Sequence, residues 1–203
     1  MRILVTGGAG FIGSHLVDAL LAAGHEVAVL DDLSTGRREN LPAAARLHVA
    51  SVATAAAEAV VLAERPEAIF HLAAQVDAAR SLAEPLLDTE VNVLGTVRLL
   101  AAAATAGVPR FVIASSAAVY GDPTVFPTVE AEPHRPLSPY GIAKSAAERY
   151  LESFARDRGL TGVALRFANV YGPRQTALGE AGVVAVFCRR LLAGAPLTIH
   201  GDG

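Results

Sequence analysis

The sequence contains a single cysteine, Cys188, so an internal disulfide and a cysteine-based metal cage are both excluded. No apolar run is long enough to cross a membrane, and no dense block of Lys and Arg indicates a nucleic-acid surface. The first residues run from a short apolar segment into glycines, without the apolar core and cleavage site of a secretory signal. We therefore expect a cytoplasmic protein with no metal and no nucleic-acid or membrane partner.

Hydrophobic residues are abundant instead. They make up 52% of the 203 residues, against 18% charged residues and a formal net charge of −3, which excludes an intrinsically disordered chain. Short β-branched runs alternate with Ala/Leu-rich stretches of helical period, a pattern typical of βαβ units and a doubly wound parallel sheet of the Rossmann type. Strands are predicted at 2–5, 26–30, 46–49, 68–72, 111–114 and 162–167, and helices at 11–23, 53–64, 85–106, 139–158 and 182–193. The proline-rich segment 122–139 is predicted to be a long ordered loop that shapes the active site.

A glycine-rich segment, Thr6-Gly-Gly-Ala-Gly-Phe-Ile-Gly13, follows the first predicted strand and opens the first predicted helix. This context is the one a dinucleotide-binding fingerprint requires, because glycines let the backbone approach a pyrophosphate at the helix N-terminus. The glycines fit two registers, one that begins at Gly7 and one that begins at Gly8, and the sequence leaves both open. Asp31 ends the second strand, where its carboxylate can bind ribose hydroxyls and repel a 2′-phosphate. The sequence therefore predicts NAD rather than NADP, with Arg37 and Arg38 as the contrary hint.

Tyr140 and Lys144 stand four residues apart and therefore share one face of a predicted helix. A tyrosine with a pKa near 10 is a poor base at neutral pH, and lowering that value by three units requires roughly 4 kcal/mol. A lysine ammonium and the positive charge of an oxidised nicotinamide would both favour the phenolate. We expect the pair to act as a proton-transfer site.

Several ordered motifs accompany this pair: TGGAGFIGSHLVDALL at Thr6, DDLSTG at Asp31, HLAAQVD at His71, NVLGT at Asn92, SSAAVYGD at Ser115, PLSPYGIAK at Pro136, LRFANVYGPRQ at Leu165 and GEAGVVAVF at Gly179. Together they make residues 1–203 resemble the extended short-chain dehydrogenase/reductases, and within them the NAD-dependent epimerase/dehydratase family and its UDP-glucose 4-epimerase group. The resemblance implies Tyr140 as the base, Lys144 as its electrostatic and ribose-binding partner, and Ser116 as the hydroxyl that hydrogen-bonds the reacting oxygen.

The resemblance also implies a cofactor site and a substrate site. The implied cofactor-binding residues are Gly7, Gly10, Phe11, Ile12, Gly13, Asp31, Asp32, Ser34, Thr35, Gly36, Ser51, Val52, Leu72, Ala73, Ala74, Val76, Asn92, Ser115, Tyr140, Lys144, Phe167 and Ala168. The implied substrate-binding residues are Ser116, Tyr140 and Asn169. The backbone amides at the helix start at Gly182 could add hydrogen-bond donors to the phosphate of the nucleotide sugar. Ser51 departs from the family, which usually has Asp there. His71 is expected to be a packing residue rather than a ligand.

The function implied is 4-epimerisation of a UDP-sugar of the UDP-glucose/UDP-galactose type, with transient oxidation at the sugar C4 by NAD. Ala117 and Ala118 stand where the related 4,6-dehydratases carry Asp-Glu, so elimination of water is not expected. The alternatives are a decarboxylase or reductase of the same family, or an inactive NAD-binding module. We expect an NAD-binding domain at 1–167 and the incomplete start of a substrate domain at 168–203. We also expect a homodimer that pairs through the helices around Leu94 and Ala147.

Overall fold

A computed structural model describes residues 1–176 and 182–199 of the chain, which forms two compact units, Met1–Ala168 and Asn169–Gly203. The motif that begins at Gly179 falls partly outside the described residues, and the terminal Gly201, Asp202 and Gly203 fall wholly outside them.

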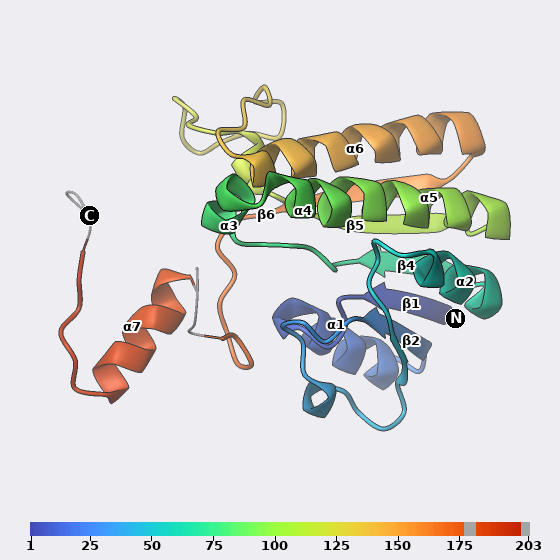
Figure 1. The fold of residues 1–203 in the computed structure, drawn as a ribbon, viewed down its shortest axis with the longest axis horizontal. Helices are drawn as coiled ribbons and strands as arrows, with labels where there is room; N and C mark the ends of the chain where they lie inside the picture. Colours follow the sequence, from blue (N-terminus) through green and yellow to red (C-terminus); the bar gives the residue numbers. More distant parts are fainter. Residues whose placement is uncertain (177–181, 200–203) are drawn as a thin grey trace. The chain divides into compact units, whose positions relative to one another are not determined.

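The first unit is built on a single parallel sheet, shown in Figure 1. Its strands are β1 (Arg2–Thr6), β2 (Glu26–Asp31), β3 (Arg46–Val49), β4 (Ala68–His71), β5 (Arg110–Ser116) and β6 (Thr161–Phe167). Their spatial order is β3-β2-β1-β4-β5-β6, with every neighbouring pair parallel. The predicted doubly wound fold is confirmed. The order reverses between β1 and β4, and ligands of such sheets bind outside the carboxyl ends of the strands at this point.

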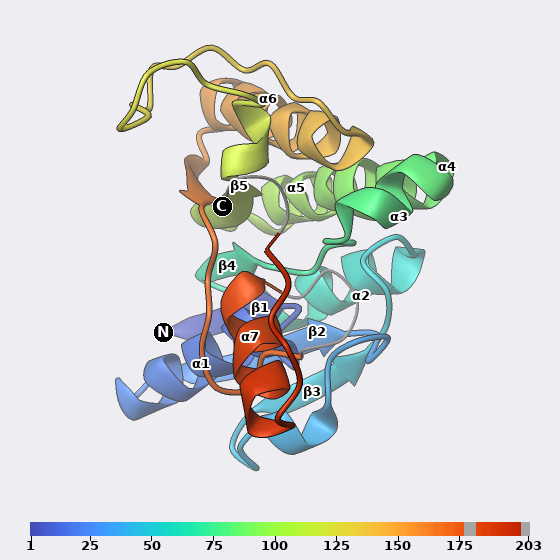
Figure 2. The same ribbon diagram turned by 90° about the vertical axis from the view of Figure 1, so that its left-hand side faces the viewer.

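Helices cover both faces of the sheet, as Figure 2 shows. They are α1 (Phe11–Ala22), α2 (Ala55–Glu64), α3 (Ala78–Ala83), α4 (Pro85–Thr89), α5 (Gly95–Ala106) and α6 (Pro139–Arg158), with shorter turns η1 (Arg38–Asn40), η2 (Glu90–Leu94) and η3 (Ala117–Val119). Helix α1 lies on one face, while α2, α5 and α6 lie on the other. Glycines end α5 and α6 in the left-handed conformation, at Gly107 and Gly159.

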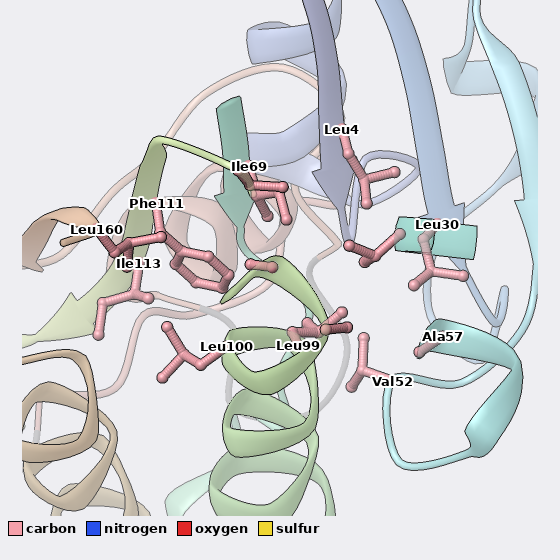
Figure 3. Close-up of a cluster of buried hydrophobic side chains, with 14 of the residues drawn as sticks. Leu4, Leu30, Val52, Ala57, Ile69, Leu99, Leu100, Phe111, Ile113 and Leu160 are labelled. Atoms are coloured by element: carbon pink, nitrogen blue, oxygen red, sulfur yellow. The ribbon is translucent and has the colours of Figure 1, made fainter. Parts of the chain in front are cut away.

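The alternation of side chains along β1 separates two hydrophobic cores. Ile3 and Val5 pack with Val17 of α1 on one face of the sheet. Leu4 points to the other face, where it joins the larger cluster with Leu99 and Phe111 that Figure 3 shows. Burial on both faces explains why the central strands read as continuous apolar runs in the sequence.

Two features of the segment between β4 and α5 were not predicted. The expected helix at 85–106 contains a π-helical turn, η2, between α4 and α5, and a separate short helix, α3, precedes it. Strand β4 ends at His71, one residue earlier than predicted, although the amide of Leu72 still donates to the carbonyl oxygen of Thr6 on β1 at 3.0 Å. π-Helical turns inside α-helices occur frequently at functional sites.

The second unit contains one described helix, α7 (Val183–Leu192), within the predicted 182–193 range. Its basic last turn is used locally, because Nη1 of Arg190 donates to the carbonyl oxygen of Pro196 at 3.0 Å and to the Thr198 hydroxyl at 2.9 Å. Before the helix, Nε2 of Gln175 donates to the carbonyl oxygen of Val170 at 3.2 Å.

Candidate functional site

At two positions of the glycine segment after β1, only a residue without a side chain fits. Gly7 has φ of +69°, and a Cβ there would lie 2.6 Å from the backbone nitrogen of Ala73. A Cβ at Gly13 would lie 2.1 Å from the carbonyl oxygen of Gly7, which is closer than packed atoms approach. The register that begins at Gly7 therefore carries the tight turn, while Gly8 serves packing because its Cβ would meet the side chain of Val29 at 2.8 Å.

This turn leads directly into the N-terminus of α1. Gly10 is the N-cap residue and offers no side-chain cap, and the first intrahelical bond of this turn runs from the amide of Ser14 to the carbonyl oxygen of Gly10 at 3.0 Å. The amides of Phe11, Ile12 and Gly13 precede that bond and have no intrahelical acceptor. A Cβ at Gly10 would meet only the carbonyl oxygen of Gly7, at 3.3 Å. Backbone donors at a helix N-terminus beside such a side-chain-free position fit a pyrophosphate.

Asp31 at the end of β2 is buried and holds the turn in place. Its Oδ2 accepts from the amide of Ala9 at 2.9 Å, and its Oδ1 accepts from the amide of Leu33 at 2.9 Å. Burial raises the pKa of Asp31, and the two backbone donors act in the opposite direction. Nδ2 of Asn40 donates to the carbonyl oxygen of Ala9 at 2.8 Å, so both backbone groups of Ala9 are fixed. Asn40 is a positioning residue that the sequence reasoning missed.

Buried hydrogen bonds fix the ring of His71 at the end of β4. The Thr96 hydroxyl donates to the carbonyl oxygen of Asn92 at 2.7 Å, so it accepts from Nε2 of His71 at 2.9 Å. Nδ1 of His71 then accepts from the Thr6 hydroxyl at 2.7 Å, and Thr6 accepts from the amide of Ala73 at 3.2 Å. Burial and the charge of Lys144 lower the pKa of His71 to about 3. The ring is therefore neutral and structural, consistent with the packing role expected for it.

Asn92 lies on η2 and is engaged inside the protein. Its Nδ2 donates to the carbonyl oxygen of Gln75 at 2.8 Å and to Oδ1 of Asp88 at 2.9 Å, and its Oδ1 accepts from the amide of Gln75 at 2.9 Å. Both amide hydrogens are thus used to hold the segment after β4. Its cofactor contact stays a prediction, while its observed role is to position the backbone around Gln75.

Ser116, Tyr140 and Lys144 come together where β5 ends and α6 begins. The Ser116 hydroxyl oxygen accepts from the amide of Ala118 at 3.1 Å and also hydrogen-bonds the Tyr140 phenol. The ammonium of Lys144 lies 5.7 Å from the centre of the Tyr140 ring and donates to the carbonyl oxygen of Ala114 at 2.8 Å. The amide of Tyr140 donates to the buried Ser81 hydroxyl at 3.2 Å, so α3 helps to place the ring.

The charges around this trio differ from the sequence expectation. Burial raises the pKa of Tyr140 above its ordinary value, the charge of Asp88 adds to that rise, and the hydrogen bond with Ser116 opposes it. Burial lowers the pKa of Lys144 to about 8, against the opposing charge of Asp88. The surroundings of Tyr140 therefore keep the phenol protonated, and the protein alone does not produce the phenolate.

A second network, which the sequence reasoning did not find, supports this end of the sheet. The buried carboxylate of Glu148, one turn after Lys144, accepts from the Ser115 hydroxyl and from Nη2 of Arg166 at 2.8 Å. Nη1 of Arg166 donates to the Tyr120 hydroxyl at 2.8 Å. The network links β5, α6 and β6 directly behind Ser116.

The remaining predicted cofactor residues follow the carboxyl ends of neighbouring parallel strands, which meet at one edge of the sheet. They are Asp32, Ser34, Thr35 and Gly36 after β2, Ser51 and Val52 after β3, Leu72, Ala73, Ala74 and Val76 after β4, and Phe167 and Ala168 at β6. The Ser51 hydroxyl oxygen is used locally, since it accepts from the amide of Ala53 at 3.3 Å. Asn169 belongs to the second unit and is outside this set.

Two absences apply to the part of the chain that the structure describes. Among residues 1–176 and 182–199, no group of three or more His, Cys, Asp or Glu side chains could hold a metal ion. Within the same ranges, no helix is long and apolar enough to span a membrane.

Comparison with known proteins agrees with this geometry. The sequence profile of the NAD dependent epimerase/dehydratase family matches residues 3–203. The UDP-glucose 4-epimerase of Mycolicibacterium smegmatis is 50% identical over 209 residues, which cover 100% of this chain and 67% of that protein. UDP-glucuronic acid decarboxylase 1 of Arabidopsis thaliana is 36% identical and matches 100% of this chain and 47% of its own length.

Two solved structures have the same fold. The UDP-glucose 4-epimerase of Thermotoga maritima, determined with UDP-glucose, is 50% identical with a TM-score of 0.97 and covers 100% of this chain and 67% of its own. The UDP-glucose 4-epimerase of Thermus thermophilus, determined with NAD, is 46% identical with a TM-score of 0.94, and the match covers 100% of this chain and 68% of that protein. The chain thus spans about two thirds of the length of these epimerases.

Proposed function

The chain belongs to the NAD dependent epimerase/dehydratase family, and we propose on that premise that it performs NAD-dependent 4-epimerisation of a UDP-sugar of the UDP-glucose/UDP-galactose type. The observation that carries the proposal is the convergence of Ser116, Tyr140 and Lys144 at the carboxyl edge of the sheet, where the glycine turn and Asp31 also lie. NAD, the cofactor of the family, supplies the hydride acceptor and donor for such a reaction.

The residues of the chain divide the remaining work among them. The Tyr140 oxygen acts as a phenolate, which the positive charge of an oxidised nicotinamide would favour. It takes the proton of the C4 hydroxyl as the sugar C4 is oxidised to a ketone, and it returns the proton when C4 is reduced again. The Ser116 hydroxyl, already hydrogen-bonded to Tyr140, orients the reacting oxygen. The buried Lys144 ammonium offsets the negative charge of this phenolate before it takes the proton.

The resident side chains determine which reactions are supported. Ala117 and Ala118 form η3 beside Ser116 and carry no acid or base, so the ketone has no catalytic group there for the elimination of water. Asp31 is fixed with its carboxylate at the end of β2, where a negative charge disfavours the 2′-phosphate of NADP. Both features support an NAD-dependent epimerase.

The likeness to UDP-glucuronic acid decarboxylase 1 makes decarboxylation the second candidate. An assay of the protein against UDP-glucose, UDP-galactose, UDP-N-acetylglucosamine and UDP-glucuronic acid distinguishes the two, because only decarboxylation releases carbon dioxide and converts the sugar into a UDP-pentose. We expect interconversion of UDP-glucose and UDP-galactose. Binding of NAD without conversion of any sugar would instead identify an inactive NAD-binding module.

A further inference from the structure

Three buried side chains, Thr96, His71 and Thr6, form a hydrogen-bond network from the start of α5 to the glycine turn after β1. The Thr96 hydroxyl donates to the carbonyl oxygen of Asn92 on η2 at 2.7 Å. The same hydroxyl oxygen lies 2.9 Å from Nε2 of His71, and Nδ1 of His71 lies 2.7 Å from the Thr6 hydroxyl. The Thr6 oxygen also accepts from the amide of Ala73 at 3.2 Å. The network therefore joins α5 to the ends of β4 and β1.

The direction of these hydrogen bonds is fixed at the Thr96 end. A carbonyl oxygen carries no hydrogen, so the hydrogen between Asn92 and Thr96 belongs to the Thr96 hydroxyl. That hydroxyl has no second hydrogen, so it bonds Nε2 of His71 as an acceptor. The neutral ring of His71 must then carry its hydrogen on Nε2 and leave Nδ1 as the acceptor for Thr6. All three side chains belong to residues at most 5% exposed, so these polar groups rely on one another for hydrogen bonds.

The Thr6 end of the network supports the glycine turn. The amide of Ala73, which Thr6 holds, lies so close to the turn that a Cβ on Gly7 would approach its nitrogen to 2.6 Å. The carbonyl oxygen of Gly7 in turn accepts from the amide of Gly10, the N-cap residue of α1, at 3.2 Å. A shift of Ala73 against Thr6 would therefore displace the turn that leads into α1. The first amides of α1 are the groups that fit a pyrophosphate.

We propose that Thr96 is a positioning residue for NAD, which holds the Nε2–H tautomer of His71 and, through it, the contact of Thr6 with Ala73 beside the glycine turn. Thr96 lies outside the glycine motif and acts on the cofactor site through the His71 ring. The proposal concerns the cofactor of the family rather than the sugar. A protein that binds NAD and fails to epimerise UDP-sugars would contradict the proposed function and leave this inference unaffected.

The tautomer of His71 can be measured in the protein without cofactor, substrate or turnover. In protein labelled with 15N-histidine, long-range 1H–15N spectra distinguish an imidazole protonated at Nε2 from one protonated at Nδ1. The sequence contains six histidines, and the signal of His71 is the one lost in His71→Asn. We expect the Nε2–H form in the parent protein and in Thr96→Ser, which retains the hydroxyl.

The substitution Thr96→Val removes the hydroxyl and keeps a side chain of nearly the same shape. Nε2–H of His71 would then be a buried donor without its acceptor, which is unfavourable. We therefore expect the Nδ1–H form, which can donate to the Thr6 oxygen, to become populated in this variant. The Thr6 hydroxyl then loses the acceptor for its own hydrogen, and its contact with Ala73 is weakened.

Calorimetric titration with NAD measures the consequence for the cofactor site. We expect Thr96→Val to bind NAD roughly tenfold more weakly than the parent protein, the order of effect of one lost buried hydrogen bond. Thr96→Ser is expected to stay within about threefold of the parent. The matched control is Thr105→Val on the same helix, because the exposed Thr105 hydroxyl also donates four residues back, to the carbonyl oxygen of Ala101 at 3.0 Å. Its NAD affinity is expected to equal that of the parent.

An Nδ1–H tautomer of His71 in the parent protein would overturn the proposal without any variant. A Thr96→Val protein that folds and binds NAD as tightly as the parent would also overturn it. The same holds for an equal loss of NAD affinity in Thr105→Val, since the effect would then be a general one of α5. If Thr96→Val does not fold, Thr96→Ala removes the same hydroxyl with a smaller side chain, and both measurements apply to it.

Discussion

The replacement Arg166→Met tests whether the network behind Ser116 stabilises the first unit. Glu148 is 3% exposed at its side chain and receives three contacts of 2.8–3.2 Å from Nε and Nη2 of Arg166. Removing the partner of a buried charge destabilises proteins by about 3–5 kcal/mol. Arg166 is 23% exposed at its side chain, so we expect a value near the lower end, about 3 kcal/mol. For a protein of this size that loss lowers Tm by about 6–12 °C.

The pH dependence of this loss is a more specific test than its size. Burial raises the pKa of Glu148, but hydrogen bonds from Arg166 and Ser115 outweigh burial, so the pKa lies below 4.5. A depressed carboxyl pKa contributes stability that is present above pH 4.5 and is lost as the pH falls through the folded-state pKa. In Arg166→Met that contribution is already absent. The difference in unfolding free energy between parent and variant is therefore largest near pH 7 and shrinks below pH 4.5.

Urea denaturation of both proteins at pH 7 and near pH 4 measures this difference. Arg149→Met is the control. Arg149 lies on α6, next to Glu148, and forms an exposed pair with Glu152 that contributes little to the free energy of unfolding. Adding Glu148→Gln to Arg166→Met removes the unpaired charge and is expected to recover part of the stability. A loss below about 1 kcal/mol at pH 7, or an equal loss at both pH values, would refute the reasoning.

The other predictions concern the cofactor and the proton. In Gly13→Ala, the new methyl group meets the Gly7 carbonyl, so calorimetry is expected to show at least a roughly tenfold weaker NAD affinity, and unchanged binding would contradict this. Asp31→Asn narrows the preference for NAD over NADP, whereas tighter NADP than NAD binding by the parent protein would contradict that role. Tyr140→Phe reduces hydride transfer far more than NAD binding, since only the ionisable oxygen is lost, and normal turnover would remove Tyr140 from the mechanism.

The sequence pattern predicted the order of the large elements because each has a strong local signal. The glycine turn, the buried strands and the helices α1 and α6 depend on neighbouring residues, and the structure places them as expected. Helix α3, with six residues, is too short for apolar periodicity to distinguish it from a loop. The π-helical turn η2 changes the spacing within a helix whose apolar pattern continues through it, so the pattern did not indicate the turn.

The networks around the site were harder to predict because they join residues far apart in the sequence. The motifs placed Tyr140 and Lys144 correctly on one helical face, but nothing local indicates that Asp88 or Arg166 would approach that helix. The charge state of Tyr140 likewise depends on burial, which motif spacing does not report. Asn92 matched a motif expected beside the cofactor, yet its amide is committed to Gln75 and Asp88.

The central claim is that Tyr140 transfers the proton in an NAD-dependent epimerisation at the sugar C4. The most direct measurement follows UDP-galactose by 1H NMR in the presence of the protein and, separately, of its Tyr140→Phe variant, with NAD binding verified for both. The account predicts that the parent protein brings UDP-galactose and UDP-glucose to equilibrium without net consumption of NAD, and that the variant does not. Unchanged UDP-galactose in the presence of the NAD-bound parent protein, or equal conversion by the variant, would contradict it.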